Sequence, residues 1–284
     1  AYRKDLTQLL EFLKGHAMVK QEEPCWQRVT KETLQAYVSV MRGKHYAIAT
    51  VARRISTAKS FFYFLAVEGI VASDPAETLA RSRVGRHVSE ALSVRKVADL
   101  LEQPCARSTP EALRDKAMLE FLYATGMLVS ELVALDLDSV APQNNRVSVR
   151  CGRDDKERLV PIHKQAARAL YVYLSEARPK LAGSRQEPAL FINWQGKRMT
   201  RQGIFWILKN YASRADIDGV TPSALRRAFV AHMVRGGAPL RSVQELLGLC
   251  APRTYIRPSS DDHMRRVYDQ AHPRADGRQP AAAS

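Results

Sequence analysis

Apolar residues recur at helical spacing through most of this chain, and this periodicity limits the possible folds more than any other feature. Residues 2–15 carry such a stripe of leucines. Comparable stripes predict helices over residues 30–41, 46–68, 93–101, 110–125, 200–212, 222–236 and 241–247. Thr30 and Ser93 are of the type that caps a helix N-terminus, and Gly69 is suited to end the third helix. The periodicity therefore predicts a mainly α protein.

Residues 144–162 follow a different pattern. Polar and apolar side chains alternate over residues 146–150, residues 152–156 have the composition of a turn, and residues 158–162 are apolar and extended. This pattern predicts a β-hairpin with a basic tip. We expect residues 190–192 to add a third short strand, so the predicted fold is mainly α with a small three-stranded β-sheet.

A polar segment divides the chain. Residues 81–87 are rich in charged side chains and lack any apolar period, which is typical of a linker. We therefore predict a helical domain over residues 1–87 and a larger domain over residues 88–275. Residues 276–284, rich in Gly, Pro and Ala, are expected to form a disordered tail.

The charge of the chain restricts its partners. The formal net charge is +15, which favours a polyanion. Residues 1–87 have a net charge of +6 and residues 88–284 one of +9, so the charge does not come from a single basic tail. Both domains are therefore expected to contact one long polyanion.

Other features exclude several classes of protein. No stretch approaches the roughly 18 consecutive apolar residues of a membrane helix, and residues 1–5 are polar rather than signal-like. The cysteines are far apart and lack the spacing of a zinc site. An integral membrane protein is excluded, and we expect a cytoplasmic protein with reduced thiols, no metal and no cofactor.

Residues 46–64 combine basic, aromatic and small hydroxyl side chains. One side of the expected helix carries Thr50, Arg53, Arg54, Ser56 and Lys59. Arginine and lysine neutralise phosphate charge, and hydroxyl groups hydrogen-bond to phosphate oxygens. This side is either a DNA contact or an ordinary solvated helix surface, and the spacing alone does not separate the two.

Short motifs of defined sequence follow one another along the chain. They include Thr-Gly-Met-Leu-Val-Ser-Glu-Leu, which begins at Thr125, and Lys-Glu-Arg-Leu-Val-Pro, which begins at Lys156. Others lie at residues 60–65, 73–76, 222–232, 243–248 and 272–275. In content and order they resemble the motifs of the tyrosine recombinases of the phage integrase family, most closely those of the Xer type.

The resemblance implies a C-shaped clamp, in which a small helical SAM-like core-binding domain and a larger catalytic-type domain close around duplex DNA. Members of the family cut and rejoin DNA through a tyrosine that forms a 3′-phosphotyrosyl bond, without metal or nucleotide. Arginines and other donors stabilise charge on the phosphate, and a hairpin lysine protonates the leaving oxygen. By position these roles fall to Tyr255 as nucleophile, to Arg226, and to Arg153 and Lys156 on the hairpin.

Four positions depart from the family pattern. Leu128 stands where the first arginine is expected, and Arg153 stands where the hairpin lysine is expected. Ser223 replaces a histidine, and Leu249 replaces the histidine or tryptophan that follows Leu-Gly. An arginine does not readily release a proton, and removing one preorganised donor lowers a rate by about 10²–10³. The resemblance is thus to a recombinase with a degenerate active site, a pseudoenzyme.

Three functions stay open at this point. The first is an inactive, site-specific or architectural DNA-binding protein in DNA recombination, located at the nucleoid, with further contacts at Arg153, Lys156, Arg201, Arg226 and Arg227. The second is an active tyrosine recombinase that uses Tyr255. The third, a pure protein-interaction module, is disfavoured by the charge. In the family the final helix commonly docks on a neighbouring subunit, so residues 262–271 are expected to mediate self-association or association with an active relative.

Overall fold

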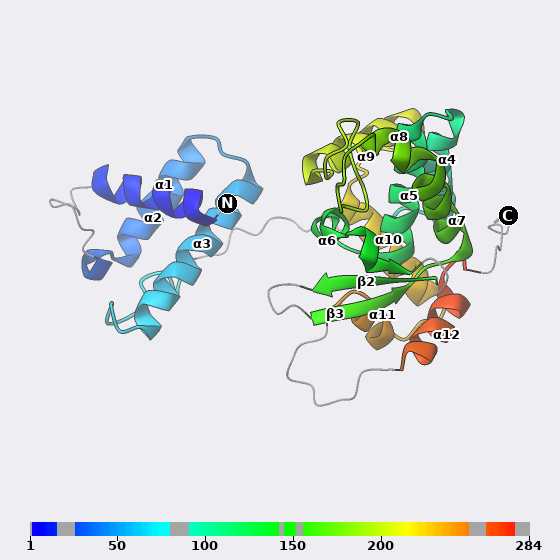
Figure 1. Cartoon of the computed structure of the whole chain (residues 1–284). Helices are drawn as coiled ribbons and strands as arrows, with labels where there is room; N and C mark the ends of the chain where they lie inside the picture. The colour runs from blue at the N-terminus through cyan, green and yellow to red at the C-terminus, as the bar shows by residue number, and fades with distance from the viewer. Residues whose placement is uncertain are drawn as a thin grey trace. The chain divides into compact units, whose positions relative to one another are not determined.

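The computed structural model describes residues 2–15, 26–79, 91–141, 145–151, 156–249 and 260–275. The chain forms two compact units, Ala1–Ser89 and Glu90–Ser284 (Figure 1). The predicted linker at residues 81–87 and tail at residues 276–284 lie outside the described residues, as do Arg153 and Tyr255. Lys156 begins a strand, but its side chain also lies outside what the structure describes.

The first unit is helical in its described part. It contains α1 (Tyr2–Gly15), a short 3-10 turn (Trp26–Arg28), α2 (Lys31–Gly43) and α3 (Ile48–Val67). Thr30 caps α2 as predicted, because its hydroxyl oxygen accepts a hydrogen bond from the backbone N–H of Thr33. The apolar stripes of the helices meet in one core, where Leu13, Leu34 and Phe62 are almost fully buried.

The second unit is larger and mostly helical, with a small sheet at one side. Its helices are α4 (Val94–Glu102), α5 (Pro110–Thr125), α6 (Val129–Ala134), α7 (Lys164–Val172), α8 (Arg178–Ala182), α9 (Arg201–Arg214), α10 (Pro222–Arg235), α11 (Leu240–Leu246) and α12 (Asp261–Ala271). A π-helical turn, Tyr173–Ala177, joins α7 to α8. Its strands are β1 (Val140–Ala141), β2 (Arg146–Cys151) and β3 (Lys156–Pro161).

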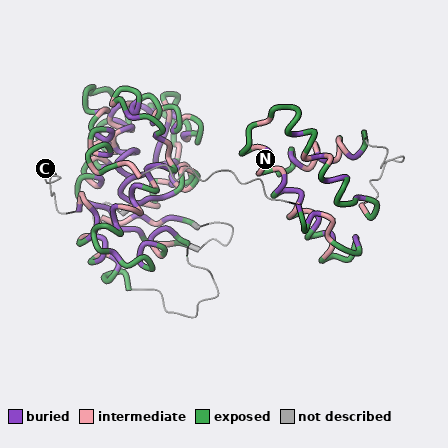
Figure 2. The backbone as a smooth tube through the Cα atoms, turned by 180° about the vertical axis from the view of Figure 1, so that it is seen from behind, coloured by how far each residue is buried: buried purple, intermediate pink, exposed green. Residues whose placement is uncertain are grey.

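Helix α5 is the centre of this unit. It contacts α4, α7, α8 and α10, and residues 117–125 are all buried. Figure 2 shows this buried interior of the second unit in purple. A helix that is covered on every side needs apolar residues all round, so α5 lacks the one-sided stripe of a surface helix. Two tyrosines bond to α5 from neighbouring helices: Tyr211 donates to Asp115 Oδ2 at 3.0 Å, and Tyr268 donates to the Ala124 carbonyl at 2.9 Å.

The sheet has the order β1-β2-β3, and both pairings are antiparallel. Val147 faces Val160 across the hairpin, and both side chains are fully buried. The predicted hairpin and the mainly α class with a small sheet are therefore confirmed. The short β1 is only an edge strand, so β2 and β3 form most of the sheet.

The prediction of the third strand was wrong in its location, because residues 190–192 lie outside the sheet. This segment makes only isolated bridges, Asp136 with Ala189 and Ile192 with Arg198. Its backbone is satisfied by other partners: the Leu190 N–H donates to the Leu135 carbonyl, and the Tyr173 hydroxyl contacts the backbone on both sides of residue 191. A run of three apolar residues therefore has the sequence pattern of a strand, although here it is buried without pairing to a neighbouring strand.

The periodicity did not predict the helices between residues 164 and 182. Helix α7 is capped by His163, whose Nδ1 accepts a hydrogen bond from the Ala166 N–H at 3.1 Å. Histidine is not among the common N-cap residues, so this start signal is absent from the usual rules. For the helices whose bounds were predicted, the predicted ends agree with the structure to within about two residues, the usual uncertainty of helix boundaries.

Candidate nucleic-acid interface

Three backbone segments meet beside α10 in the second unit. Helix α5 ends at Gly126, whose φ of 58° lies in the left-handed region. A Cβ atom at this position would lie 2.4 Å from Phe229 Cδ1 and 3.0 Å from Leu247 Cδ2. Only glycine therefore allows the turn after α5 to approach both α10 and the end of α11 this closely.

Arg226 joins these segments. Its Nη1 donates to the Gly126 carbonyl at 2.7 Å, and its Nη2 donates to the Leu247 carbonyl at 3.3 Å. A planar guanidinium with several donors can bridge two carbonyls in this way, whereas a lysine ammonium lacks the rigid fork. Arg226, predicted from the sequence as a phosphate contact, is thus seen to hold the turn after α5 to the end of α11; its contact with phosphate stays a prediction. The neighbouring Arg227 is exposed on α10.

Three of the positions that the sequence predicts to be substituted lie three residues before Arg226 on α10 or two residues beyond the carbonyls to which Arg226 donates. Leu128 immediately precedes α6 and its side chain is 48% exposed, while Leu249 follows α11 and is 60% exposed. Ser223 is exposed on the first turn of α10, one turn before Arg226. The two leucines therefore present alkyl groups to solvent, and neither side chain can donate a hydrogen bond.

An ion pair between Arg158 and Glu131 supports the turn at Leu128. Arg158 on β3 donates to both carboxylate oxygens of Glu131, at 2.8 and 2.9 Å, and its Nε donates to the Leu246 carbonyl at 2.9 Å. Glu131 in turn accepts from the Leu128 N–H at 2.7 Å. This pair links α6, the sheet and α11. Both residues lie in quoted sequence motifs, but only the fold shows that they meet.

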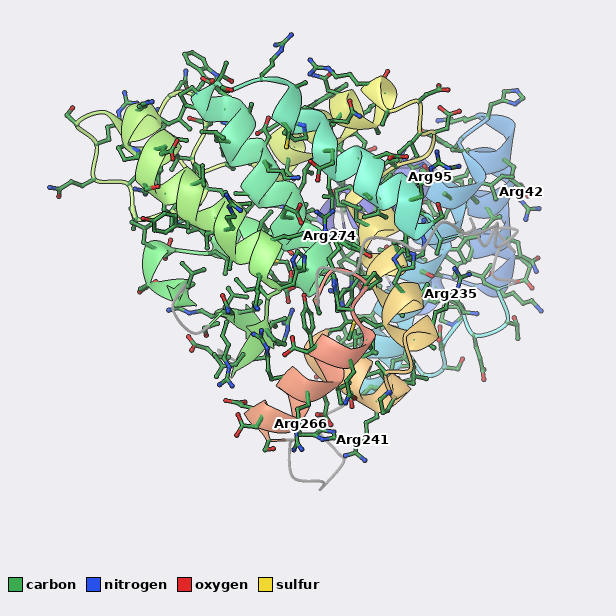
Figure 3. The ribbon with its side chains drawn as sticks, turned by 90° about the vertical axis from the view of Figure 1, so that its right-hand side faces the viewer. Arg42, Arg95, Arg235, Arg241, Arg266 and Arg274 are labelled. Carbon is green, nitrogen blue, oxygen red and sulfur yellow. The ribbon has the colours of Figure 1, made fainter. Side chains whose placement is uncertain are left out.

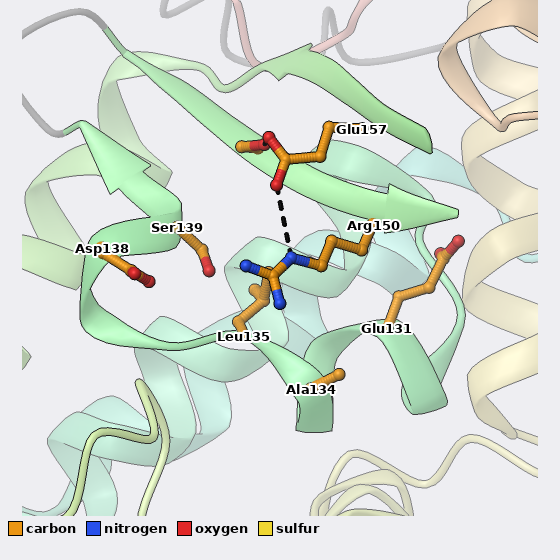
Figure 4. Close-up of a pocket in the computed structure, with 8 residues that line it drawn as sticks. Glu131, Ala134, Leu135, Asp138, Ser139, Arg150 and Glu157 are labelled. Carbon is orange, nitrogen blue, oxygen red and sulfur yellow. Dashed lines mark hydrogen bonds and ion pairs between the residues drawn. The ribbon is translucent and has the colours of Figure 1, made fainter. Parts of the chain in front are cut away.

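A small hollow of about 100 Å³ lies beside Glu131. Figure 4 shows Arg150 of β2 reaching across it to Glu157 of β3, and the Nε–Oε1 distance is 3.3 Å. Glu157 also accepts from the Ser148 hydroxyl at 2.9 Å, and together these hydrogen bonds lower the pKa of its carboxyl below the usual range. The hollow is too small for a nucleotide, and its carboxylates would repel a phosphate.

In the first unit, the predicted DNA-contact residues differ in their surroundings. Thr50 is half-buried and Ser56 is exposed. Arg53 forms an ion pair with the buried Asp5, yet 45% of its side chain is exposed. Arg54 has 11% of its side chain exposed and lies 4.1 Å from the centre of the Tyr46 ring. A DNA contact by this face stays a prediction, with Arg53 and Ser56 as its accessible members.

Lys59 is hydrogen-bonded to backbone carbonyls of its own chain. Its Nζ donates to the carbonyls of Glu77 at 2.9 Å and Leu79 at 2.8 Å. It therefore holds the segment that follows α3, in addition to any contact with phosphate. Arg201, the first residue of α9, is exposed and has no acidic neighbour in its helical turn.

A buried charged cluster, not foreseen from the sequence, anchors the end of α12. The Glu120 carboxylate on α5 lies 3.0 Å from Arg274 Nη2 and 3.1 Å from Lys116 Nζ, and burial raises its pKa. His272 stacks on Tyr268, with ring centres 4.8 Å apart, and burial lowers the pKa of His272 to about 3. Figure 3 shows Arg274 beside the helices of this region.

Helix α12 packs on its own unit. Met264, Val267 and Tyr268 are buried there. Arg265 reaches the backbone carbonyls of Asn145 and Ile162, at 3.1 and 3.4 Å. Helix α12 thus packs one face on its own unit, and its docking on a neighbouring subunit stays a prediction.

Among the described residues, no group of three His, Cys, Asp or Glu side chains is arranged to hold a metal ion. No described helix is long and apolar enough to span a membrane.

Comparison with known proteins gives consistent matches across both units. Residues 90–254 match the phage integrase family, and residues 1–69 match the phage integrase N-terminal SAM-like domain. The tyrosine recombinase XerC of Roseiflexus castenholzii is 44% identical over 277 residues, covering 96% of this chain and 86% of that protein. The tyrosine recombinase XerD of Oceanobacillus iheyensis is 35% identical over 281 residues, covering 97% and 92%.

A solved structure has the same fold. The site-specific recombinase XerH, bound to palindromic difH substrate in a post-cleavage complex, aligns with a TM-score of 0.69 and 18% identity. The alignment covers 94% of this chain and 74% of that chain. The predicted resemblance is thus confirmed for sequence and fold.

Proposed function

Because this chain belongs to the phage integrase family, we propose that it binds duplex DNA as a site-specific or architectural factor and does not cut it. In this proposal the chain is a pseudo-recombinase, a protein with the recombinase fold that does not cut DNA. Its place of action is the nucleoid in the cytoplasm, where the DNA is.

The observation that carries the proposal is the exposure of two leucines, Leu128 and Leu249, shortly after the Gly126 and Leu247 carbonyls to which Arg226 donates. During attack on a phosphodiester, negative charge builds on the non-bridging oxygens, and preorganised donors must stabilise it. Leu128 and Leu249 offer exposed alkyl groups where the family pattern has donors, and the short Ser223 side chain stands in place of an imidazole. Each missing donor lowers a rate by about 10²–10³, although such losses do not simply multiply.

The hairpin position supports the same conclusion. A departing 5′-oxygen needs a proton, and a general acid works best when its pKa is near the operating pH. Arg153 keeps its proton at any physiological pH. Lys156, three residues further on, is the remaining donor for this role.

Several features favour DNA as the partner. The net charge is +15, and both units contribute to it. Arg53 and Ser56 on α3, Arg201 on α9 and Arg227 on α10 are accessible. Among the structural relatives, XerH was solved with its DNA substrate. We propose that these residues, together with Arg226 and the hairpin residues Arg153 and Lys156, contact the phosphate backbone.

A partner protein is a further part of the proposal. Helix α12 is the segment through which this chain would associate with itself or with an active relative. Such association would allow a silent subunit to take part in DNA recombination without cutting DNA.

Two measurements test the proposal. A gel-shift series at rising salt should show duplex binding with a steep negative slope of log affinity against log salt. Absence of binding at low salt would show that the DNA-binding part is wrong. The bound duplex, selected from genomic fragments, is then prepared with a nick that traps any covalent intermediate.

The nicked duplex should yield no covalent adduct on a denaturing gel. The alternative is an active recombinase in which Tyr255 attacks with help from Arg226, Arg153 and Lys156. In that case the wild type forms an adduct, Tyr255→Phe abolishes it, and the control Tyr171→Phe on α7 keeps it. That result would refute catalytic inactivity while leaving DNA binding intact.

A further inference from the structure

Helix α9 exposes two large aromatic side chains to solvent. Trp206 is 57% exposed and Phe205 is 39% exposed, and their rings meet edge to face at 6.2 Å. Figure 1 places α9 at the top of the second unit, and it packs against α6, the helix that follows Leu128. The exposed aromatic pair therefore lies on an element that borders the candidate interface.

The opposite face of α9 carries the apolar residues that are buried in the core. Ile204, Leu208 and Ala212 are buried, and the Tyr211 hydroxyl donates to Asp115 Oδ2 at 3.0 Å. The helix is thus held by its own buried stripe. Because Phe205 and Trp206 adjoin, they form a contiguous exposed aromatic patch, and such patches mark binding surfaces more often than single exposed side chains do.

The charge of α9 indicates what covers this surface. Residues 201–214 include Arg201, Lys209 and Arg214 and contain no acidic residue. The Lys209 ammonium lies 5.6 Å from the centre of the Trp206 ring, so cation and aromatic group share one face. An acid-free helix with this composition is complementary to a nucleic acid rather than to an average protein surface.

The major groove of B-DNA is wide enough to admit an α-helix, and the apolar group that it presents is the 5-methyl group of thymine. We infer that Trp206, with Phe205, reads thymine methyl groups in the major groove and so contributes sequence preference to this protein. The inference rests on the proposed DNA-binding function and assigns to α9 a part in choosing the site. Lys209 contributes phosphate attraction and no base preference.

The test compares one duplex in two forms. The duplex selected from genomic fragments is prepared with thymine and with deoxyuridine in its place, which removes every 5-methyl group and keeps the base pairing. Fluorescence anisotropy gives the Kd of the full-length protein for each form. We expect the wild type to bind the deoxyuridine form about fourfold more weakly for each methyl group contacted.

Trp206→Ala should weaken binding to the thymine form by about tenfold and bring the thymine-to-deoxyuridine ratio close to one. Lys209→Ala should weaken both forms equally and keep the ratio. Tyr171→Ala, which removes a 66% exposed aromatic residue from α7, is the matched control and should change neither value. Thermal unfolding checks that each variant is folded.

The inference is overturned if Trp206→Ala keeps the full thymine-to-deoxyuridine ratio, or if the wild type binds both forms equally. It is also overturned if Trp206→Ala changes only the mass of the DNA-free protein by light scattering, since the aromatic face would then bind a second copy. Loss of all duplex binding by the wild type would refute the proposed function itself, which separates the two failures.

Discussion

Replacing Glu131 by glutamine tests whether its ion pair with Arg158 holds the Leu128 turn against the sheet. The two side chains are only 12% and 11% exposed, and Arg158 grips both carboxylate oxygens. Glutamine keeps the shape and can still accept from the Leu128 N–H. It removes the negative charge of Glu131 from the largely buried guanidinium, so the expected effect is electrostatic.

The magnitude follows from the geometry. Removing one partner of a buried ion pair costs about 3–5 kcal/mol. Because about a tenth of each side chain still meets water, we expect the lower end, about 3 kcal/mol. For a unit of this size that corresponds to a fall in Tm of about 6–12 °C.

Thermal unfolding followed by circular dichroism measures the effect, and the matched control is Glu157→Gln. Glu157 pairs with Arg150 in the same sheet, but those side chains are 55% and 68% exposed, so loss of this pair should lower Tm far less. In the background of Arg158→Met, Glu131→Gln should lose most of its effect. If Glu131→Gln lowers Tm no more than Glu157→Gln, the ion pair does not support the site as described.

Two further predictions concern the turn after α5 and the end of α12. Gly126→Ala combines a φ of 58° with a Cβ atom 2.4 Å from Phe229 Cδ1, so it should destabilise the protein by about 3 kcal/mol in urea titration. Gly219→Ala, also at positive φ but with open space around it, should cost about 1 kcal/mol, and equal losses would contradict the role of close contact. Burial lowers the pKa of His272 to about 3 and the pKa of His163 well below its usual value of 6.5. Between the lowered pKa of the folded protein and 6.5, the unfolded chain therefore binds more protons than the folded one. The free energy of unfolding consequently falls as the pH drops through that window. His272→Phe removes one such ring, and the slope of unfolding free energy against pH should decrease by about 1.4 kcal/mol per pH unit, whereas an unchanged slope would place the titration elsewhere.

Much of the secondary structure could be predicted because its signals are local. Thr30, Ser93 and the apolar stripes determine where helices begin and which face is buried, and the alternation over residues 146–150 determines a strand. Residues 190–192 show the limit of this reasoning. A short apolar run predicts burial, but whether it joins a sheet depends on which carbonyls lie beside it.

The candidate site was predicted only as a set of positions. Leu128, Ser223 and Leu249 were identified from motifs, but their arrangement relative to Arg226 depends on contacts between segments about 100 residues apart. Likewise, no spacing rule indicated that Arg54 would be covered by Tyr46, or that Lys59 would bond to the carbonyls after α3. The sequence around a basic side chain looks the same whether that side chain contacts a phosphate or a backbone carbonyl of its own chain.

The sequence by itself therefore determined the mainly α class, the hairpin and the strong positive charge, and it predicted that donor side chains are missing at the motif positions. These properties depend on residue type and on neighbours within a few positions. Only the tertiary structure decided that α12 is seated on its own unit, that Glu120 is buried beside Arg274 and Lys116, and that Trp206 faces water on an acid-free helix. Burial and charge pairing depend on which residues from distant parts of the chain pack against a side chain, and the local sequence pattern does not specify those residues.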